Sequence, residues 1–149
     1  MHTITHRLVV VALLALVACA SVLSYEPTAS MSADDAKLLI RRTLEEQPPG
    51  FGANDIEVTD EKLSFVRGES RYFGPIPTTS YTEATKFYFE GFKSAEISGK
   101  RRKGHVVWVF DEAGTPRFRV VVPTEEGAKR FVDALYVLSM SARSNAAER

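Results

Sequence analysis

The stretch His105–Met140 reads HVVWVFDEAGTPRFRVVVPTEEGAKRFVDALYVLSM and decides the fold. Two apolar, β-branched runs, 105–110 and 117–122, flank a turn that contains Gly114, which is the usual pattern of a β-hairpin. Thr124 follows as a predicted helix N-cap. Apolar residues then recur at helical spacing: Ala128, Phe131, Val132, Leu135 and Leu138. We therefore expect a hairpin whose sheet is covered on one face by a C-terminal helix.

The composition is that of a globular protein, and its overall charge does not indicate a strongly charged partner. The 149 residues include 44% hydrophobic and 26% charged residues, with 19 lysines and arginines against 19 acidic residues. This length accommodates one domain and an N-terminal addition. Because the formal net charge is zero, nothing in the overall charge supports nucleic acid as a partner.

The N-terminus is typical of an export signal. Residues 1–18 combine a short polar start with an unbroken apolar run, Leu8–Val17, which is too short to span a bilayer. The run ends in Leu16-Val17-Ala18-Cys19, which resembles the lipobox of bacterial lipoproteins. The resemblance implies that the chain is cleaved before Cys19, that Cys19 carries palmitate and diacylglyceryl groups, and that the protein lies in the cell envelope. The alternatives are an ordinary signal peptide cut near Ala18 or Ala20, or a buried thiol.

The residue after the cysteine bears on localisation. Ala20, rather than Asp, resembles the outer-membrane sorting pattern of enterobacterial lipoproteins, so the resemblance implies an outer-membrane protein that faces the periplasm. Residues 19–31 are small, polar and irregular, and are expected to tether the anchor to a single domain over 32–143. Residues 144–149 are expected to fray.

The domain is expected to begin with a helix over 32–47. Ser32 is a candidate N-cap, and Pro48-Pro49 ends the helix. One face of this helix is apolar and contains Ala36, Leu39, Ile40 and Leu44. A hairpin over 55–59 and 63–66 follows, and after it the glycines and prolines of 68–80 predict a loop.

The middle of the chain leaves alternatives open. Tyr72 and Phe73 could form the lip of a ligand site, or could cover an open sheet edge. Residues 86–90 and 92–97 alternate like strands, although a helix over 82–92 is the alternative. Residues 98–104 form a predicted hairpin loop that contains Lys100, Arg101, Arg102 and Lys103.

The assembled order is a helix, six or seven short strands and a closing helix, an α+β fold of mainly antiparallel β structure. The segments 56–65, 107–114 and 126–135 in this order resemble the pleckstrin-homology-like and GRAM-like superfold. That resemblance implies a curved sheet or open barrel closed by the C-terminal helix, to which the helix over 32–47 is an addition.

Catalytic chemistry has little support in the sequence. After cleavage, His105 would be the only histidine and Cys19 the only cysteine, so neither a disulfide nor a closed zinc site can form. His105 begins an apolar strand, and Trp108 lies mid-strand, where a core position is expected. We therefore expect no enzyme, no metal and no cofactor.

The expected function is a non-enzymatic binding or scaffolding module with a protein partner in the envelope. The alternative is a sensor of anionic lipids that uses the basic loop 100–103, because basic residues near strand loops hold inositol phosphates in phosphoinositide-binding members of the superfold. Near a charged bilayer each such cation contributes about 1 kcal/mol.

Overall fold

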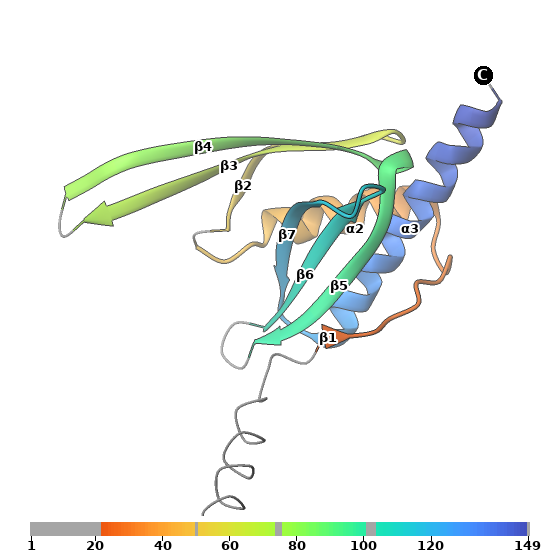
Figure 1. The fold of residues 1–149 in the computed structure, drawn as a ribbon, viewed down its shortest axis with the longest axis horizontal. Helices are drawn as coiled ribbons and strands as arrows, with labels where there is room; N and C mark the ends of the chain where they lie inside the picture. The colour runs from red at the N-terminus through yellow and green to blue at the C-terminus, as the bar shows by residue number, and fades with distance from the viewer. Residues whose placement is uncertain (1–21, 50, 74–75, 101–103, 149) are drawn as a thin grey trace, which may run out of the picture.

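The structure is a computed structural model, and it describes residues 22–49, 51–73, 76–100 and 104–148, with the backbone alone for 69–73, 76–81 and 100. Its described strands form two antiparallel sheets rather than a closed barrel (Figure 1). One sheet has the order β2-β3-β4, with bounds Ala53–Val58, Lys62–Phe73 and Ile76–Tyr88. The other has the order β1-β5-β6-β7, with bounds Val22–Leu23, Phe92–Lys100, Gly104–Asp111 and Pro116–Val122. A 3-10 turn, η1, spans Phe89–Gly91 and carries the chain from the first sheet to the second.

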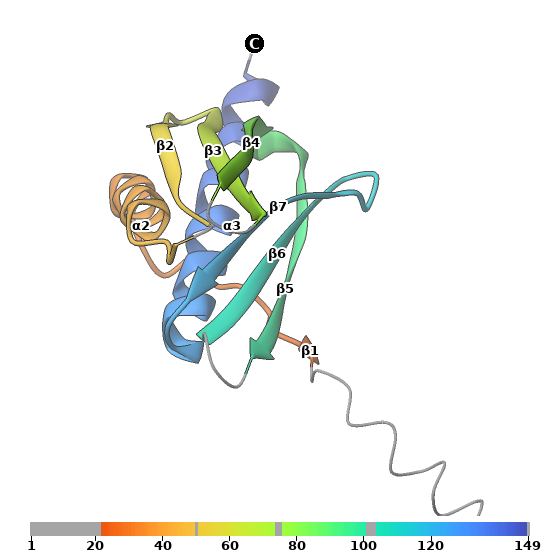
Figure 2. The ribbon, with the colours of Figure 1, turned by 90° about the vertical axis from the view of Figure 1, so that its left-hand side faces the viewer.

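The C-terminal helix α3, Glu125–Ala147, closes the core as the sequence predicts (Figure 2). Thr124 caps it, because its side-chain oxygen accepts a hydrogen bond from the backbone N–H of Gly127 at 3.1 Å. Its apolar face is fully buried and includes Ala128, Phe131, Leu135 and Leu138. The helix continues to Ala147, although we expected residues 144–149 to fray.

Phe118 joins the two sheets inside the core. Its ring packs edge-to-face on Phe65 of β3, with centroids 5.7 Å apart, and on Phe87 of β4, at 5.4 Å. Edge-to-face geometry places the positive edge of one ring on the negative face of another, which adds to the hydrophobic gain. A strand from each side thus contributes to one continuous core.

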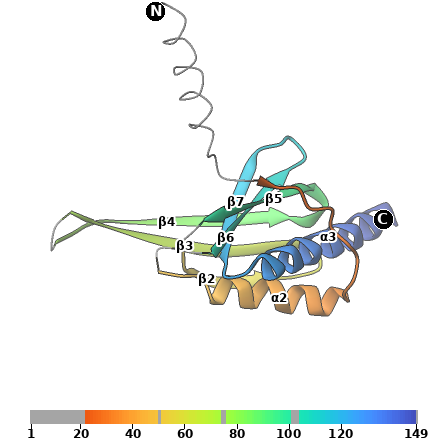
Figure 3. The same cartoon turned by 90° about the horizontal axis from the view of Figure 1, so that it is seen from below.

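The first helix, α2, spans Ala33–Glu45 and lies beside α3 and β2 (Figure 3). It buries Ala36, Ile40 and Leu44 of the predicted face, and the fourth residue of that face, Leu39, is partly buried. The Ser32 side chain accepts from the backbone N–H of Asp35 at 3.1 Å and so confirms the predicted N-cap.

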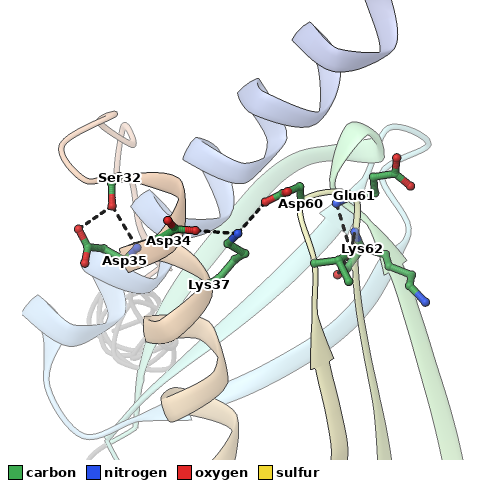
Figure 4. A network of polar contacts seen from close by, with 8 residues as sticks. Ser32, Asp34, Asp35, Lys37, Asp60, Glu61 and Lys62 are labelled. Carbon is green, nitrogen blue, oxygen red and sulfur yellow. Dashed lines mark hydrogen bonds and ion pairs between the residues drawn. The ribbon is translucent and has the colours of Figure 1, made fainter. Parts of the chain in front are cut away.

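A polar network ties the start of α2 to the β2–β3 turn (Figure 4). The Lys37 ammonium lies 2.8 Å from carboxylate oxygens of both Asp34 and Asp60. The hydrogen bond and charge of Lys37 lower the pKa of Asp34, and the two carboxylates raise the pKa of Lys37. These groups are solvated, so the network orients α2 more than it stabilises the fold.

The middle of the chain differs from two expectations. Residues 68–80 were expected to form a loop, but β3 and β4 pair from Lys62↔Tyr88 to Phe73↔Ile76, with one register shift between Arg71 and Tyr72, and form a long ribbon (Figure 1). The pairing of the two backbones outweighs the local turn signals of the glycines and prolines. The alternative helix over 82–92 is wrong as well, because those residues belong to β4, η1 and β5.

The expected tether is docked on the domain from residue 22. β1 pairs with the end of β5, with Val22 opposite Ser98 and Leu23 opposite Ile97. Leu23, Tyr25 and Met31 are partly buried against the core. The irregular composition of 19–31 therefore did not indicate the docking of this segment.

Among the described residues, none of the helices combines the length and the hydropathy needed to cross a bilayer.

Candidate functional site

The predicted site residues lie largely outside the described part of the chain. Cys19 and Arg101–Lys103 fall on residues that the structure does not describe. Lys100 is described by its backbone, which ends β5 opposite Gly104. Tyr72 and Phe73 are also described by backbone alone and occupy the last two positions of β3.

The described residues bring together no arrangement typical of a metal centre. In the ranges given above, no group of three or more His, Cys, Asp or Glu side chains could hold an ion. His105 is the second residue of β6, opposite Gly99 on β5 and Val122 on β7, and is half-buried.

A groove lies where the β3–β4 ribbon passes the β6–β7 hairpin. Its volume is about 380 Å³, and it is lined by Arg67, Glu83, Thr85, Trp108, Pro116, Arg117, Phe118 and Arg119. Ligand pockets of small molecules usually enclose about 300–1,000 Å³. We call these residues the arginine groove, because three of them carry guanidinium groups.

Trp108 and Arg119 form the wall of the arginine groove on the second sheet. They are cross-strand neighbours on β6 and β7, and the Arg119 guanidinium carbon lies 5.0 Å from the centre of the Trp108 ring. The Phe51 ring lies on the same guanidinium at 5.2 Å. These cation–π contacts hold Arg119 in place while its donors stay available. Among the described carboxylates, none forms an ion pair with Arg119.

Trp108 does not have the core position that we expected. It is half-buried on the groove side, while its neighbours Val107 and Val109 are fully buried on the other face of β6. Side chains alternate across a strand, so one face of β6 packs under α3 and the other carries Trp108. The alternation of two valines around the tryptophan was the signal that could have placed it.

The edge of β7 beside the groove is covered by side chains. The Gln47 amide donates to the Val121 carbonyl at 3.0 Å and accepts from the Val121 N–H at 2.8 Å. The Arg67 guanidinium donates to the Arg119 carbonyl at 2.9 Å and lies over the Phe65 ring at 5.3 Å. Gln47 thus pairs with the strand as another backbone would, which blocks edge-to-edge association.

The remaining charges of the groove leave it positive. Arg117 faces Asp111 at 3.8 Å, and about half of its side chain is exposed. Glu83, opposite Arg67 in the β3–β4 register, is the one carboxylate among the lining residues. Three guanidinium groups with one lining carboxylate favour an anion over a cation in this groove.

A second polar centre holds residues 22–31, here called the N-terminal segment, on α3. Asp133 is 5% exposed, and both of its oxygens lie 2.9 Å from the phenol oxygen of Tyr25. The backbone N–H of Thr28 donates to the same carboxylate at 2.7 Å. Burial, followed by the hydrogen bond to Asp133 and its charge, raises the pKa of Tyr25 above its ordinary value. Lys129 adds a cation 5.9 Å from the centre of the Tyr25 ring.

The N-terminal segment also closes over a small cavity of about 140 Å³. Its walls come from the segment, from the start of β5 and from α3, and include Tyr25, Pro27, Phe92, Val132, Tyr136 and Arg143. The Arg143 guanidinium donates to the carbonyls of Glu90 at 3.1 Å and Phe92 at 2.6 Å, so it fixes the η1 corner at the end of this cavity. The docked segment is therefore part of the packed domain.

The sequence indicated neither the arginine groove nor the contact of Asp133 with Tyr25, for identifiable reasons. The groove takes residues from β3, β4, β6 and β7, and no local spacing in the chain brings Arg67 next to Arg119. A lone carboxylate on a helix is usually solvated, so nothing in the local sequence indicates that Asp133 is buried. Its buried partner lies far from it in the sequence.

No protein-family model, no curated protein and no solved structure matches this chain.

Proposed function

We propose that this protein is a lipid-anchored lipoprotein of the bacterial envelope whose domain is a non-enzymatic binding module held close to the membrane. The observation that carries the proposal is the docking of residues 22–31. Val22 already pairs with β5, three residues after Cys19. Three extended residues reach about 10 Å, so a lipid on Cys19 would hold the β1 end of the domain near the headgroups.

The finer fold proposal is a pleckstrin-homology-like arrangement. It is supported by two successive antiparallel units, β2–β4 and β5–β7, followed directly by a helix that packs in the core. The helix α2 and the short strand β1 are additions to that order. Such modules act by recognition, which agrees with a groove lined by fixed cations rather than by an acid–base pair.

A binding role with a protein partner in the envelope is also supported by the shape of the first sheet. The β3–β4 ribbon extends beyond the helices and the second sheet (Figure 1), which leaves backbone on its outer part for contact with another molecule. A photo-crosslinking residue at Thr82, an exposed position of β4 that does not line the arginine groove, would report such a partner in intact cells. The same probe at exposed Arg130 on α3 is the control.

The anchor is tested by metabolic labelling. The wild-type protein should incorporate labelled palmitate and partition into detergent, whereas Cys19→Ala should accumulate unprocessed or outside the membrane. A protein that is cleaved, unlabelled and soluble would refute the lipoprotein proposal. Membrane proximity is tested separately by inserting a flexible ten-residue linker after Ala20, which should increase protease access to the β1 end without changing the labelling.

The alternative proposal is an anionic-lipid sensor that uses residues 100–103. It is favoured by one backbone observation: Val22, the first described residue, pairs with Ser98, two residues before Lys100, so the start of the described chain and Lys100 lie at the same end of β5. Vesicles of phosphatidylglycerol should then bind a chain produced without residues 1–19, which has neither the apolar signal nor the cysteine, at low salt, and less as ionic strength rises. Replacing all four basic residues with serine should abolish that binding, and neutral vesicles are the control. If the binding is absent, the scaffolding proposal is preferred.

A further inference from the structure

We propose that the arginine groove binds a small organic anion through a carboxylate or phosphate group held by Arg119 and Arg117. This inference goes beyond the anchored module proposed above, because it assigns a ligand class to a site of its own. It does not depend on lipidation of Cys19 or on the basic loop.

The first step of the argument is the state of Arg119. Its guanidinium carbon lies 5.2 Å from the centre of the Phe51 ring and 5.0 Å from that of the Trp108 ring, and no described carboxylate pairs with it. Contacts with two aromatic rings restrict the guanidinium, and among the described residues no carboxylate competes with a ligand for its N–H groups. A planar guanidinium with its donors in plane matches an oxyanion in bidentate geometry.

The second step is the support behind Arg119. Its carbonyl oxygen accepts a hydrogen bond from Arg67, and two residues further along β7 the N–H and the carbonyl of Val121 both bond to the Gln47 amide. The backbone that carries Arg119 is thus held by two side chains from other elements. A ligand would therefore meet an arginine that is already ordered, and binding would cost little side-chain entropy.

The third step is the size and charge of the groove. About 380 Å³ admits a small molecule, and Phe118 and Trp108 supply apolar surface for its carbon skeleton. Arg117 lies at the mouth with a distant partner, Asp111 at 3.8 Å, so its charge is only partly compensated. The lining favours one anionic group on a ligand that also has an apolar part.

Trp108 makes the proposal directly measurable, because it is the only tryptophan in the chain. The protein, purified as cells produce it, is titrated with inorganic phosphate and with succinate, and tryptophan emission and the thermal midpoint are followed. Chloride at equal ionic strength is the baseline. We expect a saturable change with at least one oxyanion and none with chloride, together with a rise in the thermal midpoint. A response to phosphate alone assigns a phosphate ligand, and a response to succinate alone assigns a carboxylate.

Two variants and a matched control complete the test. Arg119→Gln and Arg117→Gln should each weaken the apparent affinity, Arg119→Gln by about tenfold or more, since hydrogen bonds to charged groups are worth that much. Arg130→Gln removes an exposed arginine of α3 outside the groove and should bind like the wild type. The proposal is overturned if neither oxyanion gives a saturable response, or if Arg119→Gln and Arg130→Gln, both folded by circular dichroism, respond equally.

Discussion

Both carboxylate oxygens of Asp133 lie within hydrogen-bonding distance of the phenol of Tyr25, at 2.9 Å each, across 108 residues of sequence. The pair joins the N-terminal segment to the middle of the last helix. Through this pair, residues 22–31, whose composition is that of a linker, are bound to α3 and belong to the domain.

Removing the charge of Asp133 should release this segment. In Asp133→Asn, the group that accepts hydrogen bonds from Tyr25 and Thr28 loses its charge and one of its two oxygens. A hydrogen bond to a charged group contributes about 1.5–3 kcal/mol to stability. We expect a loss of about that size in the free energy of unfolding, and faster proteolysis within 22–31. Urea denaturation and limited proteolysis measure the two effects. Glu96→Gln, which replaces an exposed acid of β5, should change neither, and equal losses in both variants would contradict the role of Asp133.

The Tyr25 phenol predicts a loss of stability at alkaline pH. Its pKa is raised in the folded protein from an ordinary value of 10.0, so the folded state holds the proton more tightly than the unfolded chain. The contribution is fully present below pH 10 and declines as the pH rises through the folded-state pKa. Between pH 9 and about 11.5, the free energy of unfolding should therefore fall more steeply for the wild type than for Tyr25→Phe. Parallel curves for the two proteins would show that the phenol does not carry the effect.

Gly104 should tolerate no side chain. It has φ of +90°, and a Cβ at this position would overlap the carbonyl oxygen of Val122. The left-handed backbone alone costs a non-glycine residue about 1–3 kcal/mol. Gly104→Ala should therefore lower the thermal midpoint clearly. The matched control is Gly99→Ala. Gly99 lies on β5 opposite His105 of β6, and a Cβ added there would have no atom within 4 Å, so this variant should remain close to the wild type.

Gln47 should protect the protein from association through β7. Gln47→Ala removes both hydrogen bonds to Val121 and leaves the polar backbone of a strand edge without its partner. We expect a loss of about 1–3 kcal/mol in stability, and larger species in size-exclusion chromatography at high concentration. Glu46→Ala, the exposed neighbour, should behave as the wild type. A monomeric Gln47→Ala protein of unchanged stability would mean that the edge is protected in another way.

The closing helix should carry much of the stability. Phe131 and Leu135 are fully buried, and truncation of either to alanine should cost about 2–5 kcal/mol. Arg130→Ala on the exposed side of the same helix should cost little. Chemical denaturation of the three variants decides whether α3 closes the core, since equal and small losses would show that it does not.

The two helices and the hairpins were predictable because each has a local signal. Ser32 and Thr124 are N-caps in the sequence and in the structure, and the β6–β7 hairpin follows its apolar runs. Gly127 stands where a capping box would place Glu, and the structure supplies the reason. A Cβ there would come within 2.9 Å of the Val122 side chain. Close packing at the strand-to-helix corner therefore excludes the usual residue.

The groove and the docked segment were not predictable, because both depend on contacts between distant residues. The contacts of Arg119 with Phe51 and Trp108 depend on the register of β6 and β7 and on the path of the chain after α2. The ribbon was missed for a different reason. Its glycine and prolines signal a loop locally, while the pairing of β3 with β4 is a property of both strands together.

The length of the β3–β4 ribbon has a mechanical consequence. The strands have 12 and 13 residues, and among the described side chains those buried in the core, Leu63, Phe65 and Phe87, lie in the half next to η1. At roughly 3.3 Å per residue, a rotation of about 10° at that base would displace the far end by about 7 Å. Arg67 and Glu83, which line the arginine groove, lie between the base and the far end. The same rotation would therefore displace the far end of the ribbon more than it displaces the residues of the groove.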